Sequence, residues 1–238
     1  MQVIQPWTTD PCLNLAFEEV LLKHTSGNFC LVWQNSPTVV IGRHQDAADE
    51  VNLPLADSLE IPVIRRISGG GAVYHDNGTI NLSFITGHSY STDKLLQRVL
   101  HIFPNNITST KRNDVLINGK KVMGTAQYQI GLRQLFHASI LFNTDLELLD
   151  QILTPSSEKM HRHGISSVIQ RVTNLSEFIS PVQSIQRFAA DLITVLCPAS
   201  KPLYLSPEHE LILQTHRLAD QKYRTDKWNR IRKSSNDI

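Results

Sequence analysis

The sequence is organised around one stretch, Arg65-Arg66-Ile67-Ser68-Gly69-Gly70-Gly71-Ala72-Val73-Tyr74-His75-Asp76, in which paired arginines precede three consecutive glycines. Glycine backbone lets amide groups approach a phosphate closely, and guanidinium groups supply the matching positive charge. The stretch therefore predicts a site for a nucleotide or an acyl phosphate. The glycines do not fit G-x-x-x-x-G-K-[ST], and the residues after them favour a strand over a helix, so the P-loop and the dinucleotide fingerprint are both excluded. A bulge or a kinked hairpin without a ligand is the structural alternative.

Composition limits the class of protein and its partners. At 238 residues the chain can bury a substantial core as one large domain. Lys and Arg total 23 against 22 for Asp and Glu, a formal net charge of +1, so no bulk field points to nucleic acid or to a membrane. Cys12, Cys30 and Cys197 lie far apart in apolar patterns, which favours reduced core thiols over a disulfide or a zinc site. Without a secretory signal pattern or an apolar run of about eighteen residues, we expect a cytoplasmic protein.

Hairpins come first along the chain, and helices gather at the end. Asp76-Asn77-Gly78 predicts a hairpin that joins the glycine stretch to a strand over 79–85, and Asn118-Gly119 predicts a type I′ turn between strands 115–117 and 120–122. Further strands are predicted over 29–33, 38–41, 61–64 and 137–142. Helices are predicted from an N-cap at Asp10, and over 92–103, 145–153, 180–196 and 206–221. This order indicates an α+β fold with a mixed, largely antiparallel sheet.

Further segments, together with the glycine stretch, resemble the lipoate-protein ligase A and lipoyltransferase family. They are residues 35–45, 111–114, 119–126, 164–168 and 171–175, and the resemblance runs in family order from Asn14 to about Asn229. It implies the catalytic fold shared with biotin protein ligases, a mixed β-sheet with flanking α-helices. It also implies that residues 1–238 form a single catalytic domain, with no accessory C-terminal domain.

The resemblance implies an enzyme that attaches lipoate to the acceptor lysine of lipoyl domains of 2-oxoacid dehydrogenases or of the glycine cleavage H protein. The reaction would pass through lipoyl-adenylate, with ATP or lipoyl-AMP and Mg²⁺ as cofactors and lipoate as substrate. Lipoyl-domain carrier proteins would be the partners. Family ligases that activate free lipoate commonly extend by roughly another domain. A separate accessory subunit is therefore one alternative, and transfer of an already activated acyl group is another.

Lys121 is the predicted catalytic residue, because it matches the family's lysine in G-K-K-V-x-G-T-A. Its ammonium could reach both an acyl carbonyl and phosphate oxygens, whereas strand alternation places Lys120 on the opposite face. Asp114 could help hold Mg²⁺ or orient the lysine. The predicted ligand-binding residues are Arg65, Gly69, Gly70, Gly71, Ala72, Val73, His75, Asn81, Asn113, Asp114, Gly124, Thr125 and His137. Arg65 and the amides from Gly70 to Val73 are expected to hold the phosphate.

Several positions depart from the family pattern or keep a simpler explanation. Tyr128 stands where family ligases often carry arginine, Thr79 where asparagine is usual, and Ala138-Ser139 replace a Gly-Thr pair. His75 with Asp76, and Asn113 with Asp114, could be turn or capping pairs without a ligand. The remaining histidines, among them His161 and His163, are expected at the surface. The basic run 230–233 is expected to be a solvated tail, with contact to an acidic carrier as the alternative.

Two other functions stay open. One is an octanoyl or lipoyl amidotransferase that works through a cysteine thioester, which needs a nucleophilic thiol near the site. None of the three cysteines lies beside the matching motifs, which disfavours it. The other is a non-catalytic module that binds lipoyl-adenylate or a carrier, against which the retention of Lys121 and Arg65 argues.

Overall fold

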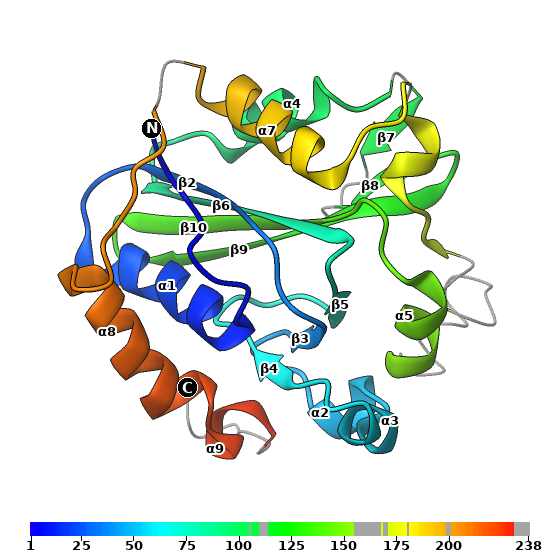
Figure 1. The fold of residues 1–238 in the computed structure, drawn as a ribbon, viewed down its shortest axis with the longest axis horizontal. Helices are drawn as coiled ribbons and strands as arrows, with labels where there is room; N and C mark the ends of the chain where they lie inside the picture. Colours follow the sequence, from blue (N-terminus) through cyan, green and yellow to red (C-terminus); the bar gives the residue numbers. More distant parts are fainter. Residues whose placement is uncertain are drawn as a thin grey trace.

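Two sheets and their covering helices make up the computed structural model, which describes residues 1–104, 106–109, 114–154, 168, 171–179, 181–198 and 201–230 (Figure 1). The strands are β1 (Gln2–Ile4), β2 (Phe29–Trp33), β3 (Thr38–Ile41), β4 (Val63–Arg65), β5 (Val73–His75), β6 (Thr79–Gly87), β7 (Ile107–Ser109), β8 (Asp114–Ile117), β9 (Lys120–Ile130) and β10 (Arg133–Leu141). The α-helices are α1 (Pro11–His24), α2 (Ala47–Glu50), α3 (Leu53–Ser58), α4 (Thr92–Leu100), α5 (Leu146–Ile152), α7 (Ile185–Leu196), α8 (Glu210–Leu218) and α9 (Asp226–Asn229). A 3₁₀ helix spans Leu175–Phe178, and a π-helix, η3, spans Ala219–Tyr223.

The larger sheet has the strand order β1-β2-β6-β10-β9-β8-β7, and the smaller sheet has the order β4-β3-β5. In the larger sheet β1 runs parallel to β2, and the other neighbours are antiparallel. In the smaller sheet β3 pairs parallel with β4 and antiparallel with β5. The predicted α+β class with a mixed, largely antiparallel sheet is confirmed.

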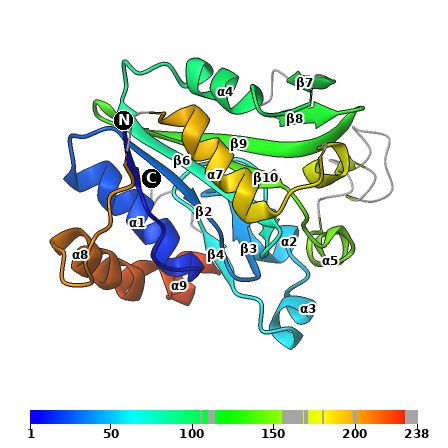
Figure 2. The same cartoon turned by 45° about the horizontal axis from the view of Figure 1, so that its top comes forward.

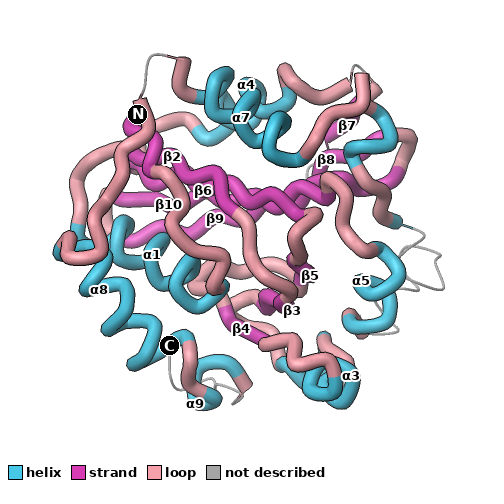
Figure 3. The backbone as a smooth tube through the Cα atoms, viewed as in Figure 1, coloured by secondary structure: helices cyan, strands magenta, loops and turns pink. Residues whose placement is uncertain are grey.

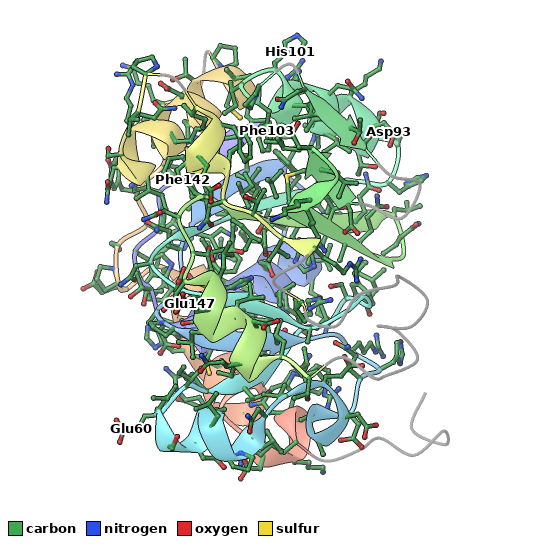
Figure 4. The ribbon with its side chains drawn as sticks, turned by 90° about the vertical axis from the view of Figure 1, so that its right-hand side faces the viewer. Glu60, Asp93, His101, Phe103, Phe142 and Glu147 are labelled. Carbon is green, nitrogen blue, oxygen red and sulfur yellow. The ribbon has the colours of Figure 1, made fainter. Side chains whose placement is uncertain are left out.

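Helices cover both faces of the larger sheet. In Figures 1 and 2, α4 and α7 lie along one face, and α1, backed by α8, lies along the other. The tube in Figure 3 shows the strands in the middle of the molecule, between these helices. Figure 4 labels Phe103 and Phe142, whose rings lie 6.2 Å and 5.0 Å from the ring of Phe188 in the core under α7. The face under α1 has its own core, which includes Ile85 and Leu135.

Local chemistry sets the start of α1 as predicted. The Asp10 carboxylate accepts hydrogen bonds from the amides of Cys12 (2.8 Å) and Leu13 (3.2 Å), and Pro11 occupies the first helical turn. A side-chain acceptor at the N-cap satisfies amides that have no partner within the helix, and proline needs none at that position. Two later helices begin a few residues after their predicted starts, because Ser184 caps α7 and His209 caps α8.

One predicted hairpin is confirmed and the other is wrong. Asn118 and Gly119, with φ of 50° and 79°, connect β8 to β9 as a type I′ turn requires. The turn at Asp76-Asn77-Gly78 also forms, since the Asp76 carboxylate accepts from the Gly78 amide at 2.8 Å. However, β5 before it pairs with β3, whereas β6 after it pairs with β2 and β10. Turn residues specify a local bend but not the partner of each strand, so this turn joins two sheets.

None of the helices within the described ranges has the length and apolar character needed to cross a membrane.

Candidate functional site

Four residues form a row across the larger sheet. The register pairs Asn81 of β6 with Ser139 of β10, Ser139 with Gly124 of β9, and Gly124 with Asp114 of β8. Residues directly opposite one another on neighbouring strands share a face. Strand alternation places Asn81 on the same face as Ile85, and Ser139 on the same face as Leu135, which is the face that α1 covers. We call these four residues the cross-strand row.

Two cavities meet at the cross-strand row. The interior cavity, of about 310 Å³, reaches Leu15, Trp33, Val40, His75, Asn81 and His137. The rim cavity, of about 210 Å³, reaches Glu50, Tyr74, Leu149, Leu153, Arg171 and Val172. Both are also lined by Gly71, Ala72, Val73, Lys121, Gly124 and Ser139. A ligand with two parts could therefore place one part in each cavity and its junction beside Lys121.

Lys121 lies in the wall that both cavities share. Its Nζ is 2.8 Å from Asp114 Oδ1, and it lies 2.7 Å from the point where a Cβ on Gly124 would stand. The missing side chain of Gly124 thus makes room for the ammonium. The backbone carbonyl of Lys121 accepts a hydrogen bond from the amide of Thr173 at 3.0 Å. Lys120 is exposed and lines neither cavity.

A β-bulge turns Lys121 towards the cavities. Val115 pairs with Met123 and Leu116 pairs with Lys121, so Val122 is an extra residue on β9. Val122 and Met123 are both fully buried in the core under α4 and α7. In a regular strand, residues three apart face opposite sides, whereas the bulge allows Lys121 and Gly124 to share one.

The loop of consecutive glycines, residues 69–71, wraps around Arg66. The Arg66 guanidinium donates to the carbonyls of Gly69 (2.7 Å), Gly71 (2.8 Å) and Val40 (3.2 Å). Gly70 has a φ of +95°, and a Cβ there would stand 2.8 Å from Arg66 Nη2. Burial is the main cause that lowers the pKa of Arg66 to about 10. The arginine that lines the interior cavity is therefore Arg66, which sequence reasoning did not select.

Arg65 was expected to hold phosphate, but it lines neither cavity. It is 2% exposed, and its guanidinium donates to the backbone carbonyls of Gly42, Arg43, Gln45, Trp228 and Asn229. The Trp228 indole donates back to the Arg65 carbonyl at 2.7 Å, and Asn229 Oδ1 accepts from the Arg65 amide at 3.0 Å. We call Arg65, Trp228 and Asn229 the α9 clamp. In this structure it attaches α9 to the strand that precedes the glycine loop.

A buried polar network supports the other side of the interior cavity. The Glu18 carboxylate lies 3.2 Å from His137 Nδ1 and accepts from Ser83 Oγ at 2.5 Å. His137 Nε2 lies 2.6 Å from Ser68 Oγ, and the Trp33 indole donates to Ser83 Oγ at 2.7 Å. Ser68, His137 and Glu18 are hydrogen-bonded one after another, as in a catalytic triad. However, Ser68 is fully buried and its hydroxyl also accepts from Arg66 Nε, so it is not placed as a nucleophile. The arrangement holds the glycine loop and His137 in place. Glu18 and Ser68 were not predicted from the sequence.

Most other predicted ligand-binding residues come together. Gly70, Gly71, Ala72, Val73, His75, Asn81, Asp114, Gly124, Thr125 and His137 line the interior cavity, whereas Gly69 does not. Asn113 lies outside the described residues, as do His161, His163 and residues 231–233. Among the described residues, no cluster of three or more His, Cys, Asp or Glu is placed to hold a metal ion.

The departures from the family pattern have local partners. Tyr128 Oη accepts a hydrogen bond from Arg43 at 3.2 Å, and the Arg43 guanidinium carbon lies 5.6 Å from the centre of the Tyr128 ring. Thr79 Oγ1 lies 2.8 Å from Thr144 Oγ1. Neither Tyr128 nor Thr79 lines the two cavities.

The cysteines lie away from both cavities, and all three are free thiols. Burial, followed by the charge of Asp10, raises the pKa of Cys12 to about 11. A hydrogen bond with Cys197 and burial raise the pKa of Cys30 well above its usual value. The same hydrogen bond lowers the pKa of Cys197 to about 7, but Cys197 lines neither cavity, so a thioester route through these thiols is not supported by the geometry.

Comparisons with known proteins agree with this geometry. A family profile described as "Lipoyl protein ligase A/B catalytic domain" matches residues 10–197. Lipoate-protein ligase 1 of Staphylococcus aureus is 34% identical over 231 residues, which cover 93% of this chain and 70% of the relative. Lipoate-protein ligase LplJ of Bacillus subtilis is 31% identical over 234 residues, covering 92% and 70% respectively.

Solved structures show the same fold. The bi-partite lipoate protein ligase of Thermoplasma acidophilum, solved in a study with its E2 lipoyl domain, matches with a TM-score of 0.81 and 25% identity over 98% of each chain. A lipoate-protein ligase A bound with ATP matches with a TM-score of 0.78 and 25% identity, over 96% of this chain and 97% of the other.

Proposed function

Because this chain belongs to the lipoyl protein ligase A/B catalytic domain family, we propose that it is an enzyme that attaches lipoate to lysine side chains of proteins through lipoyl-adenylate. The observation that carries the proposal is the position of the Lys121 ammonium, held by Asp114 in the wall shared by the two cavities. A lysine in that wall can reach the bond between an acyl group in one cavity and a nucleotide in the other.

The linings favour one assignment of the two substrates. The deep part of the interior cavity is formed by Leu15, Trp33 and Val40, each less than 7% exposed, which suits the apolar chain and ring of lipoate. The rim cavity is lined by Tyr74, Leu149 and Leu153, which suit the base of ATP. It is bordered by Glu50 and Arg171, whose charged groups suit the hydroxyls and phosphates. Lipoate and ATP would then meet over Gly71, Gly124 and Lys121.

Lys121 has a role in each step of the reaction. In adenylation, a lipoate oxygen attacks the α-phosphorus of ATP and pyrophosphate leaves. The ammonium reduces the repulsion between the two anions and stabilises the charge that develops on phosphate oxygens. In transfer, the neutral amine of the acceptor lysine attacks the acyl carbonyl, an amide bond forms, AMP leaves, and the amine proton passes to solvent. Burial of the mixed anhydride against Gly71 in the two cavities would limit its contact with water.

Asp114 is the candidate ligand for Mg²⁺. Magnesium is usually held by one or two carboxylates together with substrate phosphates and water, so a single protein carboxylate beside the junction fits this ion. Asp114 lines the interior cavity and is already 2.8 Å from Lys121 through Oδ1. An ion held by Asp114 would meet the phosphates of ATP at the shared wall beside Lys121 and would neutralise phosphate charge, while Asp114 keeps Lys121 in place.

Lipoyl-domain proteins are the proposed acceptors, since the Thermoplasma ligase is described together with such a domain. That ligase is bi-partite, and this chain matches 98% of the compared chain, which supports a second polypeptide as a partner in adenylation. We also propose that residues 1–238 act as one catalytic domain in the cytoplasm, where the three free thiols would stay reduced.

The direct test is to incubate the chain with a lipoyl domain and either lipoate plus ATP or preformed lipoyl-adenylate, and to follow the carrier mass. We expect modification of the carrier from lipoyl-adenylate by the wild type and not by Lys121→Ala. An unmodified carrier in both wild-type reactions would contradict the proposed function. Modification from lipoyl-adenylate alone would support the need for a second polypeptide.

A further inference from the structure

One buried amide in the interior cavity has no described acceptor. Asn81 is 1% exposed and lines this cavity, and no described group accepts a hydrogen bond from its Nδ2. Its other polar atom, Oδ1, accepts from Ser139 Oγ at 2.7 Å, which fixes the orientation of the amide. A buried donor without a partner costs about 1 to 3 kcal/mol, so such a group at a cavity wall indicates a ligand acceptor.

A chain of hydrogen bonds sets the direction in which Asn81 donates. It begins at Asn14 Nδ2, which donates to Asn35 Oδ1 at 2.9 Å and lies 3.1 Å from the Gln34 carbonyl. Asn35 Nδ2 therefore faces His75 Nδ1, at 3.1 Å, and an amide nitrogen can only donate.

The chain continues through the second ring nitrogen of His75. Burial, followed by the charges of Arg66 and His137, lowers the pKa of His75 to about 3, so the ring is neutral at ordinary pH. With Nδ1 accepting, the proton stands on Nε2, which donates to Ser139 Oγ at 2.8 Å. Ser139 in turn donates to Asn81 Oδ1. All bonds point the same way, from α1 to the cavity, and such chains polarise each successive donor.

Asn81 faces the region that Lys121 reaches from the other side. In the cross-strand row, Ser139 lies between Asn81 and Gly124, so these two are two strands apart. The Lys121 ammonium lies over Gly124. Two strand spacings separate the backbones by roughly 10 Å, which leaves space for a carboxyl group between the amide and the ammonium. Asn81 lines the interior cavity but not the rim cavity, which favours the acyl group over the nucleotide as its partner.

We propose that the Asn81 amide nitrogen donates a hydrogen bond to a carboxyl oxygen of lipoate and to the acyl carbonyl oxygen of lipoyl-adenylate. This inference rests on the proposed function, in which the interior cavity holds the acyl group. Asn81 then orients the carboxyl group for attack on ATP, and in transfer it helps Lys121 stabilise the negative charge that develops on the carbonyl oxygen. His75 and Ser139 are positioning residues, because they act through the amide.

The test compares two stable analogues of lipoyl-adenylate, one with the acyl carbonyl and one with CH₂ in its place. Calorimetric affinities are measured for the wild type and for Asn81→Ala. We expect Asn81→Ala to weaken binding of the carbonyl analogue about tenfold, as loss of one hydrogen bond implies, and to leave binding of the CH₂ analogue within about threefold. Asn81→Asp keeps the oxygen that accepts from Ser139 but puts a second carboxylate oxygen in place of the N–H donor. It should therefore weaken binding of the carbonyl analogue at least as much as Asn81→Ala does.

Equal weakening of both analogues would overturn the inference, as would unchanged binding of the carbonyl analogue. Failure of the wild type to bind either analogue would overturn the proposed function as well, which separates the two cases. The matched control is Thr86→Val, a buried polar position on β6 that bonds Gln134 and lines neither cavity. It should bind both analogues as the wild type does.

The role of Ser139 is tested by a double-mutant cycle. If Ser139 acts through the amide, Ser139→Ala should weaken binding of the carbonyl analogue but not of the CH₂ analogue, and Ser139→Ala combined with Asn81→Ala should be no worse than Asn81→Ala alone. Additive losses of affinity would show that Ser139 does not act through Asn81, and would overturn the role given to the chain of hydrogen bonds.

Discussion

The geometry around Lys121 is that of a cation held by two neighbours of different kinds. Asp114 fixes the ammonium by charge, and Gly124 fixes it by leaving the space above β9 empty. An ion pair whose members are 29% and 22% exposed contributes little to stability. Its value therefore lies in the position of the ammonium, and substitutions here should affect activity far more than folding.

Replacement of Lys121 should abolish most of the transfer activity. Loss of a cation that stabilises the transition state typically costs about 3 to 4 kcal/mol, or a hundredfold or more in rate. Lys121→Ala should show this loss in single-turnover transfer from lipoyl-adenylate, with an almost unchanged Tm. Lys120→Ala is the control, because Lys120 is exposed and lines neither cavity. Equal effects of the two substitutions would contradict the role of Lys121.

A single methyl group on Gly124 should displace the ammonium. A Cβ there would stand 2.7 Å from Lys121 Nζ and 2.9 Å from its Cε, so the side chain must move. Because the end of a lysine is flexible, Gly124→Ala should fold normally and lose about tenfold to a hundredfold in kcat. In Gly87→Ala the nearest atom to the new Cβ is the Leu132 carbonyl oxygen at 4.0 Å, and activity should stay unchanged. A fully active Gly124→Ala would show that the position of the ammonium is not critical.

At this scale the sequence predicts residues that occur in recognisable motifs. Lys121, His75, Asn81 and His137 were selected, and all line the interior cavity. Glu18 was missed because it lies in an ordinary helical pattern and reaches the site only when α1 covers the sheet. The sequence also could not show which of Arg65 and Arg66 lines the cavity. Because β4 ends at Arg65, the alternation of side chains between the two faces of a strand does not apply to Arg66.

At the scale of elements, the α9 clamp determines how firmly the strand before the glycine loop is held. Asn229 is 6% exposed, and it serves two elements at once. Its Oδ1 accepts from the Arg65 amide at 3.0 Å, and its Nδ2 donates to the Tyr223 carbonyl at 2.7 Å. Removal of this side chain leaves the buried Arg65 amide without its acceptor, and leaves the Tyr223 carbonyl with only the weak donor Cys12 Sγ at 3.4 Å.

Asn229→Ala should therefore lower the free energy of unfolding by about 2 kcal/mol, measured by urea denaturation. Arg230→Ala is a neighbouring control. Its side chain is 40% exposed and pairs with the exposed Asp57 carboxylate at 2.6 Å, so its loss should cost less than about 1 kcal/mol. A smaller effect for Asn229→Ala than for Arg230→Ala would mean that the clamp does not stabilise the fold.

Elements were predicted well where the local chemistry was complete. The Asp10 cap and the Asn118-Gly119 turn specify their structures without distant partners. The turn at residues 76–78 was recognised, but the pairing of β5 with β3 depends on residues more than thirty positions away. The bulge at Val122 could not be predicted, because Val-Met is a common apolar pair in regular strands. The bulge follows from burial of both side chains in the core under α4 and α7.

At the scale of the whole molecule, burial of the cross-strand row and its neighbours makes stability depend on pH. His75 has an ordinary pKa of about 6.5 when unfolded and about 3 in the folded protein, with burial as the first cause. Between these values the unfolded state binds more protons, so the free energy of unfolding falls as the pH falls from 6.5 towards 3.

His75→Gln should flatten this dependence. The wild type should lose up to about 1.4 kcal/mol of stability per pH unit between pH 6 and 4.5, and the variant should lose less. Urea denaturation at several pH values measures the difference. Glu19 adds to the slope near pH 4.5 in both proteins, so its effect cancels in the comparison. Burial raises its pKa, but Lys222 and hydrogen bonds from Lys222, Lys23 and Tyr223 outweigh burial and lower it, so its contribution is lost as the pH falls below about 4.5. Identical slopes would contradict the low pKa of His75.

The α9 clamp also sets an order of events during protein synthesis. Arg65 and its partner Asn229 are 164 residues apart, and a ribosome adding roughly 5 to 20 residues per second needs on the order of ten to thirty seconds to pass from one to the other. For that interval Arg65 can reach the carbonyls of Gly42, Arg43 and Gln45 but not those of Trp228 and Asn229. The contacts between the strand before the glycine loop and α9 therefore form only after nearly the whole chain has been synthesised, which makes the α9 clamp a late step of folding.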